Sequence, residues 1–365
     1  MARPIYVPAL GVRRNTVAAY RALPDRARAR IMPLWTVVPR VGERTRGEWP
    51  QRDPDPDPAA LDGWLTERVD ALVEAMAGRA GWIDPRHVEA HGEASARALW
   101  HVATRSRLRL VTGLDRPERL QRHAADLAFL CGRGLGLRVL VDKEPAVPRA
   151  GELLALTSRL CVPPSQLDLL LDVGPVVDAE RSAKSAVTAV DLLSGLRPWR
   201  SVVLVCGGFP LGPDGGDGHP FQQVPRLDRQ VYETVRAARA TGMREVVYGD
   251  YATDHALSAD RPRADEVRPR WGLLRYTTAE HHLLARAPLT GPDRTERVRA
   301  AAHRLLRHPE FRGAAYSEGE NWLHACATGT GPRGSGNLET WIRVGHIQHI
   351  AWAVEQGLRP PAGPG

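Results

Sequence analysis

Three aspartates stand at the ends of short apolar runs, where chemistry is often placed. Asp84 closes GWID, Asp172 lies within LDLLLDV, and Asp250 precedes Tyr251 in VVYGDY. Carboxylates serve as general acids and bases or as oxygen ligands of divalent cations. Several of them at one site need an arginine, a metal ion or a bound proton to offset their repulsion. We therefore expect Asp84, Asp172 and Asp250 to be catalytic, either in acid–base work or as ligands of Mg²⁺ or Mn²⁺. The alternative is that each caps the helix that follows it.

Basic and aromatic side chains near the same run ends could bind the charge of a substrate. Arg13 follows the first run, Arg138 lies in LRVLV, and His255 comes soon after Asp250 and Tyr251. An arginine fork pairs well with carboxylate and phosphate groups. We therefore expect an anionic small molecule or a peptide as the ligand, bound by Arg13, Arg138, Tyr251 and His255.

Other motifs have weaker functional interpretations. His346 and His349 share one face of a predicted helix, where a surface or helix-capping role is expected. Lys143 lies at a run end, but Asp142 and Glu144 beside it would keep the amine protonated, which disfavours a Schiff base. The glycine-rich segment 207–219 is typical of a phosphate loop, a lid or a plain surface loop.

Eight short β-type runs alternate with helical segments along most of the chain. The runs are apolar without strict alternation, which is typical of parallel strands covered on both faces. This order predicts an α/β fold, and the count favours a closed TIM-like (β/α)₈ barrel over an open doubly wound sheet, which remains the alternative. The predicted strands are residues 5–10, 31–38, 81–84, 108–114, 137–141, 167–173, 201–206 and 245–248.

The pattern changes after the eighth run. Residues 272–276 and 281–286 predict a β-hairpin, and residues 294–308 and 338–356 predict helices. We interpret residues 1–256 as the barrel and residues 257–365 as a C-terminal extension packed on it. In such a barrel, active-site residues lie at the C-terminal ends of the strands, so the three aspartates are expected at one mouth.

Composition narrows the functional classes. The chain has 365 residues and a formal net charge of +8, but its arginines are spread out with no dense basic tract. Nucleic-acid binding is therefore disfavoured. The four cysteines stand far apart, which excludes Cys-x-x-Cys zinc and redox motifs. No leader-like or membrane-spanning apolar stretch is visible, so we expect a cytoplasmic protein. The oligomeric state does not follow.

A set of short motifs resembles a known family. YVPAL, IMPL, LDLLLDV, VVYGDY, LLRYT and NLETWIRVGHIQHI are together similar to the bacterial and phage beta protein family, which is largely uncharacterised. The resemblance implies a TIM-barrel-like fold, and it adds Arg275 and Tyr276 to the expected substrate-binding residues. It also implies a lysine where Arg13 stands and a glutamate on the second strand, where this chain has Thr36, so the activity of this member could differ.

Two functions are consistent with these patterns. The first is an enzyme that acts on an anionic small molecule or a peptide through the strand-end carboxylates. The second is a non-catalytic binding or phage-defence-associated protein whose barrel mouth captures a partner.

Overall fold

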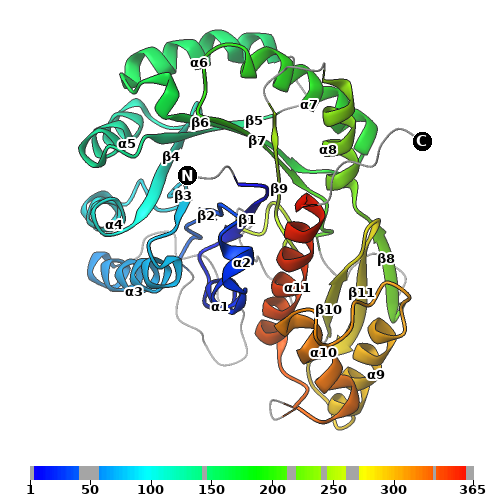
Figure 1. Ribbon diagram of the computed structural model, residues 1–365. Helices are drawn as coiled ribbons and strands as arrows, with labels where there is room; N and C mark the ends of the chain where they lie inside the picture. The colour runs from blue at the N-terminus through cyan, green and yellow to red at the C-terminus, as the bar shows by residue number, and fades with distance from the viewer. Residues whose placement is uncertain are drawn as a thin grey trace.

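The computed structural model describes residues 4–40, 57–141, 146–211, 219–239, 245–259, 271–331 and 334–358. Eight parallel strands close into a barrel in the order β1-β2-β3-β4-β5-β6-β7-β9 (Figure 1). The predicted (β/α)₈ barrel is thus confirmed, and the open sheet is wrong, because β9 pairs with both β7 and β1. The barrel strands are β1 Val7–Gly11, β2 Leu34–Thr36, β3 Ala80–Asp84, β4 Arg107–Gly113, β5 Leu135–Leu140, β6 Leu167–Pro175, β7 Ser201–Gly207 and β9 Val247–Asp250.

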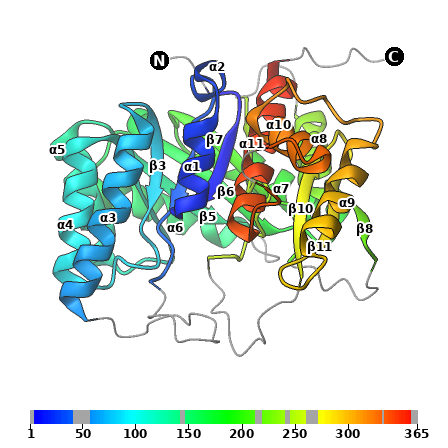
Figure 2. The same cartoon turned by 90° about the horizontal axis from the view of Figure 1, so that it is seen from below.

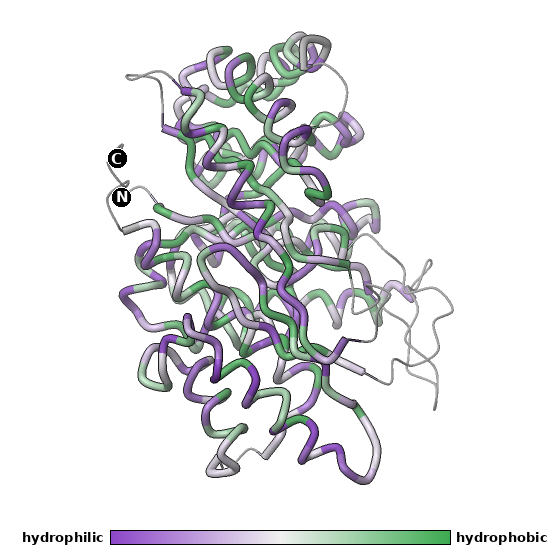
Figure 3. The backbone as a smooth tube through the Cα atoms, turned by 90° about the vertical axis from the view of Figure 1, so that its right-hand side faces the viewer, coloured by the Kyte–Doolittle hydropathy of each residue, from purple (hydrophilic) through white to green (hydrophobic). Residues whose placement is uncertain are grey.

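Helices surround the barrel and cover the outer face of its strands (Figures 1 and 2). Their apolar residues recur at helical spacing, as in α3, where Leu61, Leu65, Val69 and Leu72 are all buried. Green and purple therefore alternate along the helical parts of the tube in Figure 3. These helices are α1 Arg14–Ala22, α2 Asp25–Arg28, α3 Pro58–Met76, α4 Gly92–Arg105, α5 Glu118–Cys131, α6 Ala146–Leu160, α7 Ala179–Ser194 and α8 Leu227–Ala238.

The position beside α1 is filled by the last helix of the chain. In residues 251–259, which directly follow β9, the structure contains no helix. Instead α11, Leu338–Leu358, packs along α1, and Ile347, Ile350 and Val354 join the hydrophobic core between the barrel and its helices. The chain therefore leaves the barrel after β9 and returns through α11 to complete the helical layer.

Between β9 and α11 the chain builds a second, smaller unit. The predicted hairpin is confirmed as β10 Trp271–Thr277 and β11 His281–Pro288, and the two predicted helices as α9 Arg294–Leu306 and α11. Two elements were not predicted. These are β8, Phe221–Pro225, which pairs with β11 from within the β7–α8 connection, and α10, Glu318–Thr328.

The division of the chain at residue 256 stays a prediction. Contacts cross it in both directions, because β8 completes the sheet β10-β11-β8 and α11 packs on the barrel. Among the described residues, no helix has the length and apolar character needed to cross a membrane.

Neighbouring residues of a strand point to opposite faces of the sheet, so every second side chain points into the barrel. These inward side chains form layers across the barrel interior. An apolar middle layer includes Trp82, Val111, Leu170 and Val203. Toward the N-terminal strand ends, the buried Asp168 accepts hydrogen bonds from Arg109 Nη1 (3.0 Å), Arg200 Nε (2.9 Å) and Ser201 Oγ (2.7 Å). A second polar layer lies toward the C-terminal strand ends, and it contains the candidate site.

Candidate functional site

Arg138 is the centre of the polar layer at the C-terminal strand ends. Its Nη1 donates to Asp84 Oδ2 (2.6 Å), while its Nε and Nη2 donate to Asp172 Oδ2 (2.9 and 2.6 Å). All three side chains are buried inside the barrel wall, on β5, β3 and β6. The guanidinium thus joins two of the three aspartates that the sequence predicts at one mouth.

Tyr251 completes this arrangement just past β9. Its hydroxyl contacts both oxygens of Asp172 (2.9 and 2.8 Å) and accepts from Arg138 Nη2 (2.8 Å). Burial and the negative charge of Asp172 raise the pKa of Tyr251 well above its ordinary value, so the phenol keeps its proton. These contacts fix the direction in which Arg138 points.

Arg116 extends the cluster toward the rim. Its Nη2 donates to Asp84 Oδ1 (2.8 Å), and the same guanidinium reaches Asp115 Oδ2 (2.6 Å) and Glu89 Oε1 (2.5 Å). Burial alone would raise the pKa of Asp84, but Arg116 and Arg138 lower it below its ordinary value. We call Asp84, Arg116, Arg138, Asp172 and Tyr251 the mouth network.

Glu89 differs from the aspartates of the mouth network. Burial raises its pKa from 4.5 to about 7, because the attraction of Arg116 is offset by the nearby charges of Asp84 and Asp115. A carboxyl group with a pKa near neutrality can both give and take a proton at physiological pH, which acid–base catalysis requires.

A small cavity opens beside the mouth network. Its volume is about 20 Å³, which is enough for a single water molecule. Arg138 and Tyr251 line it from inside the barrel, and Thr36 lines it from the end of β2. Arg86 and His87 line it from the connection that also carries Glu89.

Asp254 lies on the far side of this cavity and gathers two of the predicted arginines. Arg13 Nη1 donates to its Oδ2 and Arg275 Nη1 to its Oδ1, both at 3.3 Å. Burial would raise the pKa of Asp254, but His346, Arg13 and Arg275 together hold it well below its ordinary value. Arg13 and Arg275 are therefore paired with a carboxylate that lines the cavity, and their predicted role in substrate binding stays a prediction.

The expectation that Asp250 shares this mouth is wrong. Asp250 and Tyr251 are consecutive, so their side chains leave β9 on opposite faces. Tyr251 packs with the residues inside the barrel, whereas Tyr6 and Tyr248, which both donate to Asp250, belong to the core outside it. Asp250 is thus buried between the barrel wall and the second unit.

A separate cluster surrounds Asp250 there. His349 Nε2 lies 2.9 Å from Asp250 Oδ2, and Arg226 Nη2 lies 3.5 Å from the same oxygen. Burial would raise the pKa of Asp250, but His349 lowers it overall by its charge and its hydrogen bond. Asp228 and His282 belong to the same cluster. We call this cluster the interface network, and its residues are Tyr6, Arg226, Asp228, Tyr248, Asp250, His282 and His349.

Asp228 and Arg226 form the second half of the interface network. Arg226 Nη2 donates to Asp228 Oδ2 (2.9 Å), and the Tyr248 hydroxyl, which has one proton to give to either Asp228 or Asp250, lies 2.5 Å from the same oxygen. Asp228 also explains the glycine at position 208, because a Cβ there would lie 2.0 Å from Asp228 Oδ1. The network therefore depends on a close approach of the β7–α8 connection.

The remaining predicted residues lie elsewhere. His255 Nδ1 accepts from the backbone N–H of Leu257 within its own loop (3.1 Å) and does not line the cavity. Tyr276 is wrongly predicted at the mouth: it is buried in the core of the second unit, where its hydroxyl accepts from Arg312 N (3.0 Å).

The predicted surface or capping role of His346 and His349 is also wrong, since both side chains are fully buried. Lys143 and its neighbours Asp142 and Glu144, and most of the glycine-rich segment 207–219, lie outside the described residues.

Several residues of the two networks are not among those that the sequence pattern predicts. Arg116 and Glu89 belong to strand–helix connections, and the signal was available in Asp115-Arg116 directly after the fourth strand. Arg226 and Asp228 follow the glycine-rich segment, and the sequence predicts no strand between that segment and these two residues. Their pairing depends on β8, which the sequence did not reveal.

The described residues contain no group of three or more His, Cys, Asp or Glu side chains placed to hold one metal ion. The oxygens of Asp84 and Asp172 instead face arginine nitrogens. What this mouth offers a ligand is therefore hydrogen-bond donors and positive charge.

Comparison with known proteins supports the resemblance seen in the motifs. No curated protein matches the chain. The model of one family, described as "Beta protein", matches residues 6–355, from the bridge before β1 to the last turns of α11. The chain therefore belongs to the beta protein family.

Proposed function

We propose that the barrel mouth binds the anionic group of a small molecule or a peptide and acts on it by acid–base chemistry. The observation that carries this proposal is the setting of Arg138, a buried arginine that lines the cavity at the C-terminal strand ends. Four of its five N–H groups are accounted for by Asp84, Asp172 and Tyr251, and Nη1 carries the remaining one.

Preorganised donors of this kind stabilise negative charge at little cost when the ligand binds. Arg138 is held by two carboxylates and a phenol, so its position is set before any ligand arrives. Because the cavity admits about one water, the group that reaches Arg138 would be a single carboxylate or phosphate oxygen. The rest of the ligand would meet Arg86, His87 and Thr36.

The same geometry changes the roles proposed for the aspartates. Asp84 is held by Arg116 and Arg138, and Asp172 by Arg138, Tyr251 and the backbone N–H of Gly174. Asp84 also holds its proton less readily than an ordinary carboxyl. They are positioning residues for Arg138. Glu89, with a pKa of about 7, is the group suited to exchange a proton with a bound substrate.

A binding protein without catalysis is the second candidate. The observation that favours it is that every aspartate of the mouth network is paired with arginine, as in a site built to hold charge rather than to transfer protons. The two functions share the ligand site and differ only in turnover.

Replacing Arg138 and a matched arginine tests the site. Arg138→Gln and Arg109→Gln both remove an arginine that pairs with a buried aspartate inside the barrel, but at opposite ends. In a thermal-shift screen of small carboxylates, phosphate esters and short peptides, hits with the wild-type protein should be lost only in Arg138→Gln. If Arg138→Gln does not fold, Arg86→Ala provides the same test at the cavity wall.

Turnover of the hits then separates the two candidates. Chemical change of a hit by wild-type protein, lost in Glu89→Gln and retained in Asp115→Asn, supports the enzyme. Binding without change supports the binding protein. Compounds that still bind to both Arg138→Gln and Arg86→Ala would show that the ligand binds elsewhere, which would contradict the proposal.

A further inference from the structure

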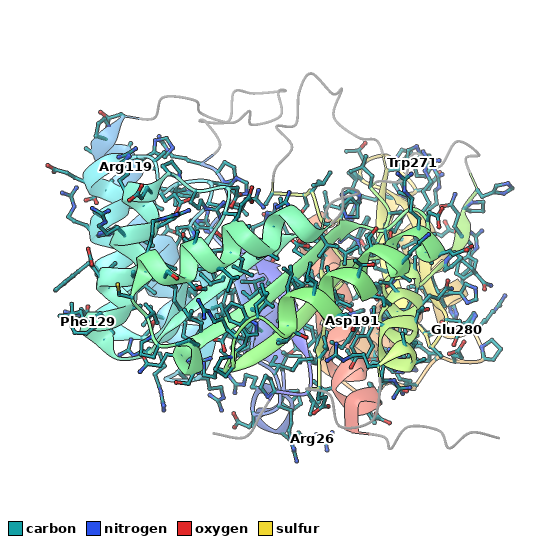
Figure 4. All side chains as sticks on the ribbon, turned by 90° about the horizontal axis from the view of Figure 1, so that it is seen from above. Arg26, Arg119, Phe129, Asp191, Trp271 and Glu280 are labelled. Atoms are coloured by element: carbon teal, nitrogen blue, oxygen red, sulfur yellow. The ribbon has the colours of Figure 1, made fainter. Side chains whose placement is uncertain are left out.

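A second concave site lies in the C-terminal unit and shares no lining residue with the cavity at the barrel mouth. It has a volume of about 240 Å³ and is found where β10 begins and β11 ends, with α9 as its other wall. Three arginines line it, together with Trp271. In Figure 4, Trp271 and Arg119, at the start of α5, both lie along the upper edge of the view, and Glu280 and Phe129 lie below them. We call Trp271, Arg286, Arg297 and Arg304 the arginine pocket.

Trp271 holds two of the guanidinium groups in place. The guanidinium carbon of Arg286 lies 4.9 Å from the centre of the Trp271 ring, and that of Arg297 lies 4.6 Å from it. A guanidinium stacked on an aromatic ring keeps its N–H groups directed outward from its edge, available to a third group. Within the described structure, Arg286 Nε is buried and donates no hydrogen bond.

The charge of the pocket is uncompensated by the described part of the chain. Arg297, Ala300 and Arg304 are spaced along one face of α9, so both cations point to the same side. No ion pair joins Arg286, Arg297 or Arg304 to a carboxylate among the described residues. Like charges held close together destabilise the free protein, and a bound anion would relieve that repulsion.

We propose that the arginine pocket binds a phosphorylated small molecule. A phosphate ester carries close to two negative charges and three acceptor oxygens, which suits several guanidinium forks better than a single carboxylate does. The volume is below the roughly 300 Å³ at which pockets for drug-sized ligands begin, so a sugar phosphate is of suitable size. Pro220, Pro288 and Ala300 would contact its carbon skeleton. This site is independent of the function proposed for the mouth.

Ribose 5-phosphate is a practical probe, with unphosphorylated ribose as its neutral counterpart. Calorimetric titration of the full-length protein at constant ionic strength should show binding of the phosphate ester and none of ribose. Arg297→Glu and Arg304→Glu should each weaken binding at least about tenfold, because each replaces a charge-assisted donor with a repelling carboxylate. Arg286→Gln, which keeps a similar shape, should weaken it as well.

Arg307→Glu is the matched control, because Arg307 is exposed at the end of the same helix and does not line the pocket. It changes the net charge as Arg304→Glu does, so equal weakening by both variants would show a general charge effect and overturn the proposal. Failure of the wild-type protein to bind ribose 5-phosphate would overturn it too. A third outcome would also overturn it: the protein binds a short single-stranded oligonucleotide but not ribose 5-phosphate, and the same variants lose that binding. The surface would then bind nucleic acid.

Discussion

The mouth network and the interface network use the same side-chain types in different surroundings. Each places a buried arginine between two aspartates, with tyrosine hydroxyls on the carboxylates. In the mouth network, Arg138 and Tyr251 line a cavity. In the interface network, Arg226, Asp228 and Asp250 are at most 2% exposed, and the strand wall on one side and α11 on the other enclose them.

This difference indicates what each network is for. An arginine that lines a cavity can exchange water for a ligand, so the mouth network is suited to recognition. The interface network includes residues of the barrel, β11 and α11, and its burial costs desolvation that no ligand can offset. We interpret it as the contact that fixes the second unit on the barrel in one orientation.

Removing a charge from the interface network should have the largest effect on stability. Asp250→Ala leaves Arg226 and His349 buried without this partner, so we expect the free energy of unfolding to fall by about 3–5 kcal/mol. Chemical denaturation measures the change. Asp115→Ala, at a half-exposed rim carboxylate, should cost less than about 1 kcal/mol. Equal costs for the two variants would contradict the distinction between a sealed and an open network.

The pH dependence of stability should have opposite signs at Glu89, which pairs with Arg116 of the mouth network, and at His282 of the interface network. The pKa of Glu89 is about 7 in the folded protein and about 4.5 when unfolded, so its contribution is fully present below pH 4.5 and is lost as pH rises through 7. The loss is on the order of 3 kcal/mol. Burial lowers the pKa of His282, so that group acts in the opposite direction, losing its contribution as pH falls below its ordinary value of 6.5.

Glu89→Gln isolates the contribution of the mouth. Denaturation at several pH values should show that the wild-type protein loses stability relative to this variant as pH rises from about 4.5 to about 7. Asp115→Asn should keep a loss of stability with rising pH, because Glu89 is still buried, but over a narrower range, since the charge of Asp115 helps to raise the pKa of Glu89. A difference between wild type and Glu89→Gln that stays constant with pH would show that Glu89 does not titrate in this range.

Two matched tyrosine variants compare the networks directly. Tyr6→Phe removes a hydroxyl that donates to Asp250 and lies 3.2 Å from His349 Nε2, in fully buried surroundings. Tyr251→Phe removes one beside a cavity that can admit water. We expect losses of about 2–3 kcal/mol for Tyr6→Phe and about 1 kcal/mol for Tyr251→Phe, because water can replace only the second. The reverse order in denaturation experiments would mean that the mouth is the more tightly sealed of the two.

The barrel and most of its strands and helices could be predicted because the sequence signals for them are local. Apolar β-runs and helical periodicity lie within single segments, and they gave the strands and their order around the barrel. One of the two elements that were not predicted has no local signal in the sequence. β8 is FQQVP, a short strand with two glutamines on the edge of its sheet, and only its pairing with β11 defines it. The helix α10 did have a local signal, Ser317 followed three residues later by Glu320, and in the structure Ser317 caps the helix by accepting from Gly319 N.

The site was predicted in part, for a reason of geometry. Asp84, Asp172 and Arg138 lie at inward positions of their strands, and Tyr251 is inward at the end of β9. Asp250 precedes Tyr251 by one residue, and a shift of one residue on a strand reverses the face on which a side chain lies. Choosing between the two required knowing which residues of β9 face the barrel interior. The sequence of this strand, apolar on both faces, does not indicate that.

Arg13→Ala should have the smallest effect, and it tests the boundary between the two networks. Asp254 is the carboxylate where the barrel meets the second unit near the mouth, with Arg13 on one side and Arg275 on the other. Arg13 is 30% exposed and its contact with Asp254 is 3.3 Å, so its loss should cost less than about 1 kcal/mol and should vanish in 1 M salt. Arg275, stacked on Phe209, remains to hold Asp254. If Arg13→Ala cost as much as Tyr6→Phe at high salt, the sealed contact between barrel and second unit would have to extend as far as the mouth.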